Sequence, residues 1–309
     1  MRILVMGAGG VGGYFGAQFA RAGHEVAFVA RGPHLAALRE HGLRLESELA
    51  PLHLTDVVAD SDPARLGPAD IVMFCTKVWD VGQGARQIAR AIAPGGLVIP
   101  FQNGVESHLI LRDALGSERV AGGVAQISAT IKAPGVIEQV GPFARLRIGA
   151  FRAEQETPLK GFAETGARAG IDIEVVSDIE RALWEKFVFL VAISGVMSLA
   201  RQPIGVVRTD LDLRATLTAA LEEAVAVARA RRVALDSDVV AATLKLIDWL
   251  QPGMRASMLN DLTRGNRLEA PWLAGAVARM ARDAGLAAPV NATIYAALKP
   301  YLDGTPKAY

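Results

Sequence analysis

Residues 2–30 read RILVMGAGGVGGYFGAQFARAGHEVAFVA, and this stretch decides the fold. A β-rich run at 2–6 ends in glycines, residues 13–23 carry apolar side chains at helical spacing, and 24–30 supply a second strand. Strand, glycine turn, helix and strand within one compact unit call for a right-handed parallel crossover. We therefore expect an α/β fold with a Rossmann-type, doubly wound sheet.

The alternation of strand and helix continues beyond this unit. Strand-like runs at 70–76 and 96–104 enclose a helix-like stretch at 81–96. Residues 119–149 show period-two patterning broken by Pro-Gly and Gly-Pro turns, as antiparallel strands do, and these strands could extend the same sheet.

The second part of the chain has a different pattern. After a last strand-like run at 171–176, amphipathic helical stretches follow one another to the end. At 309 residues the chain is long enough for two domains. We predict a dinucleotide-binding Rossmann-like domain at 1–177 and an all-α substrate and catalytic domain at 178–309.

Composition excludes several classes of protein. Hydrophobic residues make up 51% of the chain, which favours dense cores, and the formal net charge of +1 lacks the basic excess of a nucleic-acid-binding protein. A single cysteine, Cys75, suits a reducing cytosol, and its apolar neighbours predict a buried thiol.

The most apolar segment is too short to predict a membrane span. It covers 187–200 and is bracketed by Lys186 and Arg201, whereas a span needs about 20 residues. We expect a buried helix, no membrane partner and, since the N-terminus lacks signal-peptide features, a cytoplasmic location.

The glycines after the first strand form the G-x-G-x-x-G motif. Between a strand and a helix, such glycines allow a tight turn and let backbone N–H groups approach a pyrophosphate. The predicted cofactor-binding residues here are Gly7, Ala8, Gly9, Gly10, Val11 and Gly12.

Arg31 predicts which dinucleotide binds. It follows the second strand, where an NAD-binding protein carries an acidic residue for the ribose hydroxyl. A guanidinium instead favours the 2′-phosphate of NADP(H), although a solvated surface arginine is the ordinary alternative.

Lys186 is an ammonium at the start of an apolar run. A hydride added to a carbonyl carbon leaves charge on the oxygen, which an acid must protonate. At the start of a buried helix, desolvation and the positive helix end would both lower the pKa of this lysine towards a useful value, whereas a snorkelling lysine is the alternative. Histidines do not offer a metal-like spacing, so we predict no metal site, and all five lie in the nucleotide-binding half: His24, His34, His41, His53 and His108.

Five blocks in order resemble the ketopantoate reductase (2-dehydropantoate 2-reductase) family over nearly the whole chain. They are GAGGVG at 7–12, CTKVWD at 75–80, QNGVE at 102–106, LWEKF at 183–187 and SMLNDLTRGNRLEAPWLAGAVARMARDAGLAAPVN at 257–291.

The resemblance implies a role for several side chains. Lys186 matches the proton donor, and Glu269 matches an acidic residue at the cofactor and substrate cleft. Lys77 and Asn103 match positions that contact NADP(H), with Asn103 also near the substrate, and Ser257 matches a group that holds the substrate carboxylate.

Each of these residues also has an ordinary interpretation. Lys77 could be a surface charge at a strand end, and Asn103 with Gly104 is a good turn dipeptide. Ser257 could cap a helix, and Glu269 could interact with the dipole of the next helix.

Some positions depart from the family pattern. The family has asparagines one and two turns after the lysine, where this chain has Leu190 and Ser194. At two further positions where the family has asparagine, this chain has Met254 and Ile204. Ser194 remains a predicted substrate-binding residue. Loss of polar contacts favours a more apolar 2-oxo acid.

We therefore predict an NADP-dependent oxidoreductase that reduces a 2-oxo acid, with ketopantoate to pantoate in pantothenate biosynthesis as the leading reaction. A 3-hydroxyacid dehydrogenase is a close alternative, but Phe189 stands where its K-x-x-N motif has asparagine. A protein that senses NADP(H) without turnover is a third, and late helices could form a homodimer face.

Overall fold

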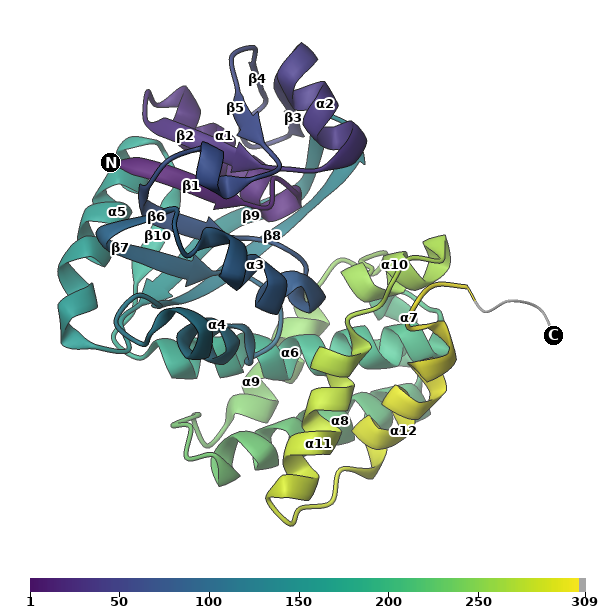
Figure 1. Ribbon diagram of the computed structural model, residues 1–309. Helices are drawn as coiled ribbons and strands as arrows, with labels where there is room; N and C mark the ends of the chain where they lie inside the picture. Colours follow the sequence, from purple (N-terminus) through teal and green to yellow (C-terminus); the bar gives the residue numbers. More distant parts are fainter. Residues whose placement is uncertain (306–309) are drawn as a thin grey trace. The chain divides into compact units, whose positions relative to one another are not determined.

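The computed structural model describes residues 1–305, which divide into two compact units (Figure 1). The first holds Met1–Gln102 and Glu106–Ala182. The second holds Asn103–Val105 together with the residues from Leu183 on. The domain boundary between residues 177 and 178 stays a prediction.

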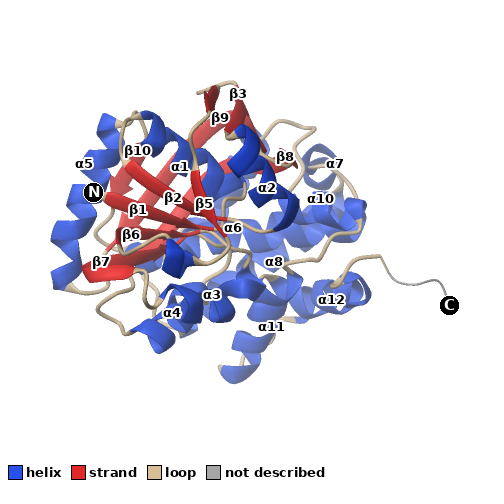
Figure 2. Ribbon diagram, turned by 45° about the horizontal axis from the view of Figure 1, so that its top comes forward, coloured by secondary structure: helices blue, strands red, loops and turns tan. Residues whose placement is uncertain are grey.

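A parallel five-stranded sheet organises the first unit, in the order β5-β2-β1-β6-β7 (Figure 2). The chain builds outward from β1 in one direction and then returns to add β6 and β7 on its other side, so β1 and β6 flank the point where ligands bind in such sheets. The strands are β1 (Arg2–Met6), β2 (Glu25–Val29), β5 (Val58–Asp60), β6 (Ala69–Phe74) and β7 (Ile92–Pro100).

Both faces of this sheet are buried, as the apolar sequence of its strands requires. Ile3 and Val5 of β1 enter one core, and Leu4 and Met6 enter the other, because successive side chains of a strand point to opposite faces. Full burial of each such side chain contributes about 2 kcal/mol. The helices that supply the two cores are α1 (Gly10–Arg21), α2 (Gly32–His41) and α5 (Glu156–Arg168) on one face, and α3 (Val81–Ile88) and α4 (Ser107–Leu115) on the other. The doubly wound α/β fold is confirmed.

The antiparallel strands form a second sheet and do not extend the first, which corrects the expectation for residues 119–149. Their order is β10-β9-β3-β4, with β8 paired to β9, and an isolated bridge between Val98 and Val120 is the recorded link to the first sheet. Helix α1 packs between the two sheets: a Cβ at Gly10 would lie 2.1 Å from the Ala129 carbonyl oxygen, and one at Gly13 would lie 2.8 Å from Ile137. The strands are β3 (Leu43–Ser47), β4 (Leu52–Leu54), β8 (Gly122–Ala133), β9 (Val136–Gly149) and β10 (Asp172–Val175).

The helix expected at 81–96 is shorter than its pattern suggested. Helix α3 ends at Ile88, and β7 begins at Ile92, where it pairs with Ala69 of β6. Pairing with a neighbouring strand therefore overrides the local helical pattern. Short 3-10 turns complete this unit at Pro63–Arg65, Val78–Asp80 (η2) and Ala153–Gln155.

The second unit is built from helices. Leu217, Leu221 and Val225 of α8 recur every four residues and are buried, so they form one apolar stripe. The helices are α6 (Ile179–Ala200, of which residues from Leu183 on belong here), α7 (Ile204–Thr209), α8 (Leu211–Ala230), α9 (Val239–Trp249), α10 (Ser257–Arg264), α11 (Ala274–Asp283) and α12 (Pro289–Leu298), with 3-10 turns η4 (Ala270–Trp272) and η5 (Lys299–Tyr301).

Helix α6 contains the apolar segment. Its 22 residues and mean hydropathy of 1.6 would by length and composition suit a membrane span, but 72% of that apolar window is buried inside the folded chain. The segment 187–200 is thus a buried helix, as predicted.

Candidate active site

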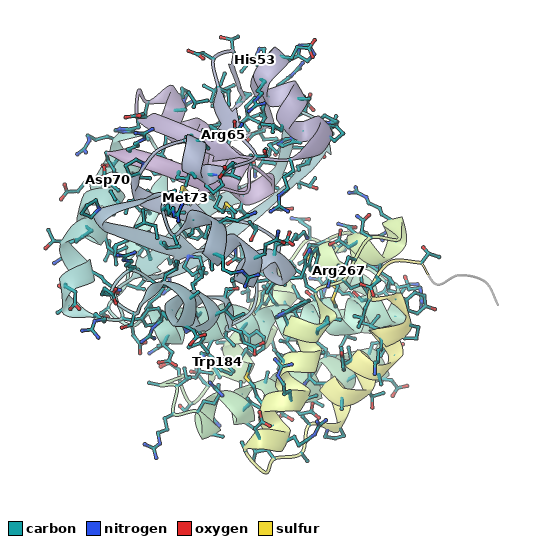
Figure 3. All side chains as sticks on the ribbon, in the orientation of Figure 1. His53, Arg65, Asp70, Met73, Trp184 and Arg267 are labelled. Atoms are coloured by element: carbon teal, nitrogen blue, oxygen red, sulfur yellow. The ribbon has the colours of Figure 1, made fainter. Side chains whose placement is uncertain are left out.

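Lys186 lies inside α6, about two turns after the helix begins at Ile179. The expectation that it stands at the helix start is therefore wrong, and the helix dipole, which acts within the first turn, does not account for its properties. Its neighbours along the helix are apolar: Trp184, labelled in Figure 3, contacts Phe187 edge to face at a centroid distance of 5.2 Å, and both of these side chains are buried.

Asn103 joins Lys186 to Glu269 through two hydrogen bonds. The Lys186 Nζ donates to Asn103 Oδ1 at 3.0 Å, and Asn103 Nδ2 donates to Glu269 Oε2 at 2.9 Å. These two bonds fix which way the Asn103 amide faces. Asn103 and Glu269 are 166 positions apart in the chain, so the fold assembles this group from distant segments.

Local backbone geometry holds Asn103 in place. Gly104 has a φ of +91°, and a Cβ there would lie 3.2 Å from the Trp272 carbonyl oxygen. Glycine therefore serves both the turn and its close approach to η4, the segment that follows Glu269. Asn103 and Gly104 thus lie in a bend of the chain, which is compatible with a role for the Asn103 side chain.

Burial and charge act on Lys186 in opposite directions. Desolvation lowers the pKa of the Lys186 ammonium from its ordinary value to about 8, while the Glu269 carboxylate opposes this shift. Glu269 is itself only 7% exposed. The lysine can consequently be a proton donor at neutral pH and lose its proton at mildly alkaline pH.

Glu269 and Ser257 do not cap helices with their side chains. Glu269 occupies the N-cap of η4 without a side-chain cap bond. Ser257 is the exposed first residue of α10, and the N-cap of that helix is Ala256. The capping interpretation of Ser257 is therefore excluded, whereas the position of Glu269 at the N-cap of η4 is compatible with its dipole interpretation.

The remaining predicted substrate positions also lie in the second unit. Ser194 is on α6 two turns beyond Lys186 and is 2% exposed. Within the described chain, neither Ser194 nor Ser257 has a recorded hydrogen bond to the Lys186, Asn103 and Glu269 group.

Three of the positions that depart from the family pattern, Leu190, Met254 and Ile204, are apolar here. Leu190 is one turn beyond Lys186 and is half-buried. Ile204 is fully buried, and its N–H donates to the carbonyl oxygen of Met254 at 3.0 Å. The backbone therefore links two of these positions directly.

The glycine loop of the first unit fits a dinucleotide pyrophosphate. Gly7 has a φ of +105°, and Gly12 approaches so closely that a Cβ would lie 2.2 Å from the Gly7 carbonyl oxygen. A Cβ at Gly9 would instead meet no atom within 4 Å, and the first turn of α1 carries no acidic residue. The N-terminus of α1 is thus open to an anion.

Two cations on the first unit remain predicted cofactor ligands. Arg31 is exposed at the N-cap of α2, and its Nη2 donates to Gln87 Oε1 at 3.4 Å. Lys77 is exposed at the N-cap of η2, with its Nζ 5.5 Å from the centroid of the Trp79 ring. Gln87 is neutral, so within residues 1–305 this bond leaves the charge of Arg31 uncompensated.

Gln102 is a neighbour of the site that sequence reasoning missed. Its Nε2 donates to the carbonyl oxygens of Phe74 at 2.8 Å and Thr76 at 3.1 Å. The side chain thereby ties the segment after β7 to the end of β6, immediately before Asn103. The adjacent amides of the QNG sequence were the available signal.

Metal-ligating side chains do not cluster in the part of the chain that the structure describes. Within residues 1–305 no group of three or more His, Cys, Asp or Glu residues could hold a metal ion. Burial raises the pKa of the Cys75 thiol, and the residue packs partly buried against the core, so it is a poor nucleophile.

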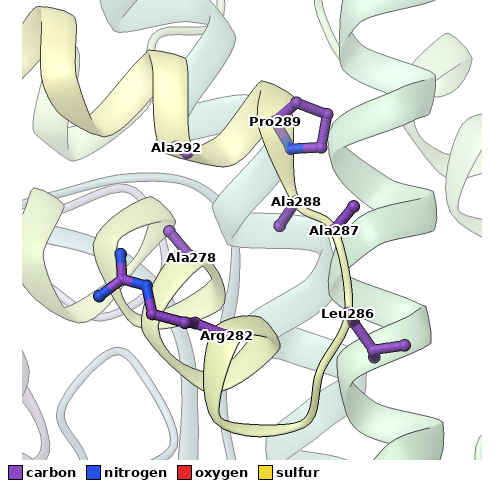
Figure 4. Close-up of a pocket in the computed structure, with 7 residues that line it drawn as sticks. All are labelled: Ala278, Arg282, Leu286, Ala287, Ala288, Pro289 and Ala292. Atoms are coloured by element: carbon purple, nitrogen blue, oxygen red, sulfur yellow. The ribbon is translucent and has the colours of Figure 1, made fainter.

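An open pocket of about 370 Å³ lies beside the connection between α11 and α12 (Figure 4). It is mostly apolar and contains none of the predicted site residues. Its lining consists of Ala278, Arg282, Leu286, Ala287, Ala288, Pro289 and Ala292.

Comparison with known proteins finds one family along nearly the whole chain. The family model for ketopantoate reductase PanE/ApbA matches residues 3–153, and that for its C-terminal part matches 178–302. The 2-dehydropantoate 2-reductase of Archaeoglobus fulgidus is 32% identical over 95% of each chain, and the uncharacterized oxidoreductase YkpB of Bacillus subtilis is 28% identical over 97% of this chain and 99% of its own.

Solved structures show the same relationship. The crystal structure of a PanE/ApbA family ketopantoate reductase from Ralstonia eutropha superposes with a TM-score of 0.89 at 32% identity, covering 97% of this chain and 98% of that one. The chain therefore belongs to the ketopantoate reductase family of oxidoreductases.

Proposed function

We propose that this protein uses NADPH to reduce a 2-oxo acid to the 2-hydroxy acid, and that ketopantoate is the first substrate to test. The observation that carries the proposal is the hydrogen-bonded group of Lys186, Asn103 and Glu269, with a lysine pKa of about 8. Membership in the ketopantoate reductase family supports the same reaction.

The nicotinamide, when bound, supplies the hydride that reduces the keto carbon. Negative charge then develops on the carbonyl oxygen, and the Lys186 ammonium stabilises this oxygen and donates a proton to it. The overall change adds one hydride and one proton to the carbonyl, and it leaves Lys186 as a neutral amine until it takes a proton from water.

Asn103 and Glu269 prepare Lys186 for this role. Asn103 Oδ1 accepts one of the three ammonium protons and so directs Nζ. The Glu269 carboxylate favours the charged lysine against the effect of burial. Without this opposing charge, desolvation would act alone and leave a smaller protonated fraction at neutral pH.

NADPH is the proposed cofactor because Arg31 stands at the start of α2 with an uncompensated charge. A 2′-phosphate would accept charge-assisted, bidentate hydrogen bonds from this guanidinium. Gly9 and the N-terminus of α1 would hold the pyrophosphate, and Lys77 is a further proposed contact.

The substrate carboxylate is proposed to bind at Ser257. This exposed residue begins α10, so its hydroxyl and the first N–H groups of the helix are available to an anion. Asn103 and Ser194 are proposed to contact the rest of the substrate, together with Lys186.

A more apolar 2-oxo acid is the second candidate substrate, and Leu190 and Met254 favour it. A pocket built from such side chains cannot hydrogen-bond the hydroxyl group of ketopantoate. The 3-hydroxyacid dehydrogenase alternative is disfavoured by the half-buried Phe189 at its asparagine position.

Substrate preference can be tested with two acids that differ by one hydroxyl. Replacing Leu190 by Asn should raise kcat/KM for ketopantoate about tenfold, because a hydrogen-bonding group is restored, and should leave trimethylpyruvate, which lacks the hydroxyl, unimproved. Initial rates of NADPH oxidation measure both. An unchanged ratio between the two acids would place Leu190 outside the substrate pocket, and no oxidation with any 2-oxo acid would refute the proposed function.

Replacing Lys186 by Ala should lower kcat about 10²- to 10⁴-fold, since the proton donor is removed, while the NADPH dissociation constant changes less than about twofold. Stopped-flow turnover and NADPH fluorescence titration measure the two quantities. Lys160→Ala, at an exposed lysine of α5, is the matched control and should be unaffected. A nearly normal kcat in Lys186→Ala would remove this lysine from the chemistry.

The two directions of the reaction should depend on pH in opposite ways. Reduction needs the charged lysine, so its kcat/KM should fall as pH rises through the Lys186 pKa of about 8, whereas oxidation of the hydroxy acid needs the neutral amine and should rise over the same range. Steady-state rates between about pH 6 and pH 10 provide the test. Parallel trends in both directions would contradict the assignment.

Replacing Arg31 by Ala should weaken NADPH binding at least about tenfold and NADH binding less than about twofold, because only the 2′-phosphate is lost as a partner. Dissociation constants from fluorescence titration decide, with Arg90→Ala as a control at another exposed arginine of the same unit. Equal losses for both dinucleotides would show that Arg31 does not read the phosphate.

A further inference from the structure

His34 is a polar side chain of the first unit that the proposed reaction does not use. It lies in the first turn of α2, close after Arg31, and is partly buried. Both of its ring nitrogens are engaged: Nε2 is 2.8 Å from the Ala8 carbonyl oxygen, and the Gly135 N–H donates to Nδ1 at 3.1 Å. The ring therefore connects α2 with the glycine loop and with the turn between β8 and β9.

These contacts fix the protonation state of the ring. A backbone N–H can only donate, so Nδ1 must be the unprotonated acceptor, and the single proton must sit on Nε2 and point at Ala8. Burial lowers the pKa of His34, against the opposing effect of the bond to Ala8, which is consistent with a neutral imidazole.

The Gly135 side of the ring is held independently. Gly135 has a φ of +76°, and its carbonyl oxygen accepts the N–H of Arg44 at 2.9 Å. A Cβ at Gly135 would lie 3.1 Å from the Cβ of Ala37 on α2, so the turn already packs against that helix. The turn thus holds the His34 ring in the position from which it binds the Ala8 carbonyl.

The Ala8 carbonyl shares a peptide unit with the N–H of Gly9. In a trans peptide these two groups point in opposite directions, so a bond that holds the carbonyl also aims the N–H. The Ala8 N–H is held as well, by the carbonyl oxygen of Val29 at 3.0 Å. Within residues 1–305 the Gly9 N–H has no recorded acceptor, and Gly9 is where the surface is open.

We propose that His34 is a positioning residue for the dinucleotide: its Nε2–H, by holding the Ala8 carbonyl, aims the Gly9 N–H at the cofactor pyrophosphate. The inference rests on the proposed use of a dinucleotide and extends it to a residue that need not touch the cofactor. The bond from Gly135 sets the tautomer and the orientation of the ring. The bond to Ala8 then holds the glycine loop in a fixed position relative to the ring.

Two amide variants separate the two halves of this arrangement. His34→Gln places an amide nitrogen near the position of Nε2 and keeps a donor for Ala8, whereas His34→Asn reaches only the position of Nδ1 and keeps an acceptor for Gly135. The dissociation constant for NADPH should stay within about twofold in His34→Gln and rise about fivefold in His34→Asn. The kcat at saturating NADPH should be unchanged in both.

The results distinguish a positioning role of His34 from a role in packing alone. Equal NADPH affinities of the two variants, or weaker binding by His34→Gln, would overturn it. A general loss of packing would not depend on whether the variant keeps a donor for the Ala8 carbonyl. Melting temperatures identify a variant that fails to fold. In that event ring-nitrogen NMR of the unaltered protein decides: the neutral Nε2–H tautomer supports the inference, and an Nδ1–H or charged ring overturns it. Failure of the unaltered protein to bind either dinucleotide would overturn the proposed function as well.

Discussion

The desolvation of the Lys186 ammonium is the constraint that explains the arrangement of its partners in the second unit. A buried lysine is unfavourable unless other groups offset the loss of water, and here Asn103 and Glu269 do so. To bring those partners to α6, the fold needs the turn at Gly104 and the close approach of η4. The opposing effects of burial and of Glu269 leave a lysine whose charge is stable at neutral pH but easily lost.

The glycine-rich start of the chain serves packing as well as the proposed cofactor binding. Gly10 and Gly13 lie against Ala129 and Ile137 of the second sheet, whereas Gly9 faces open space. Two sheets can enclose α1 only if that side of the helix lacks side chains. The glycines of the motif thus meet the requirements of the core and would also meet those of the proposed cofactor.

Local patterns were sufficient to predict much of the fold. The first strand, the glycine turn, α1 and β2 follow from periodicity over a few residues, and the run after Lys186 was correctly predicted as a buried helix. The second sheet was not predicted, because an antiparallel hairpin has the same pattern whichever sheet it joins. The end of α3 at Ile88 was missed for a similar reason, since pairing with β6 converts the following residues to a strand.

The candidate site shows the same limit. An ammonium in an apolar run marked Lys186, but the contact of Asn103 with Glu269 spans 166 positions and was not predicted; the family resemblance named each residue only as a separate site position. His34 was missed because it binds backbone atoms, which have no sequence signature, and Gln102 was missed although its amide stands directly before that of Asn103 in the sequence. The dipole argument for Lys186 was wrong because α6 begins earlier, at Ile179.

The apolar surface of α6 also has a consequence for biosynthesis. Val188, Val191 and Val196 are completely buried in the finished structure, yet they leave the ribosome before α8 and the later helices exist. Until those segments are translated, a long hydrophobic stretch stays exposed to water and to other nascent chains. The helix that carries Lys186 is therefore exposed to aggregation during synthesis.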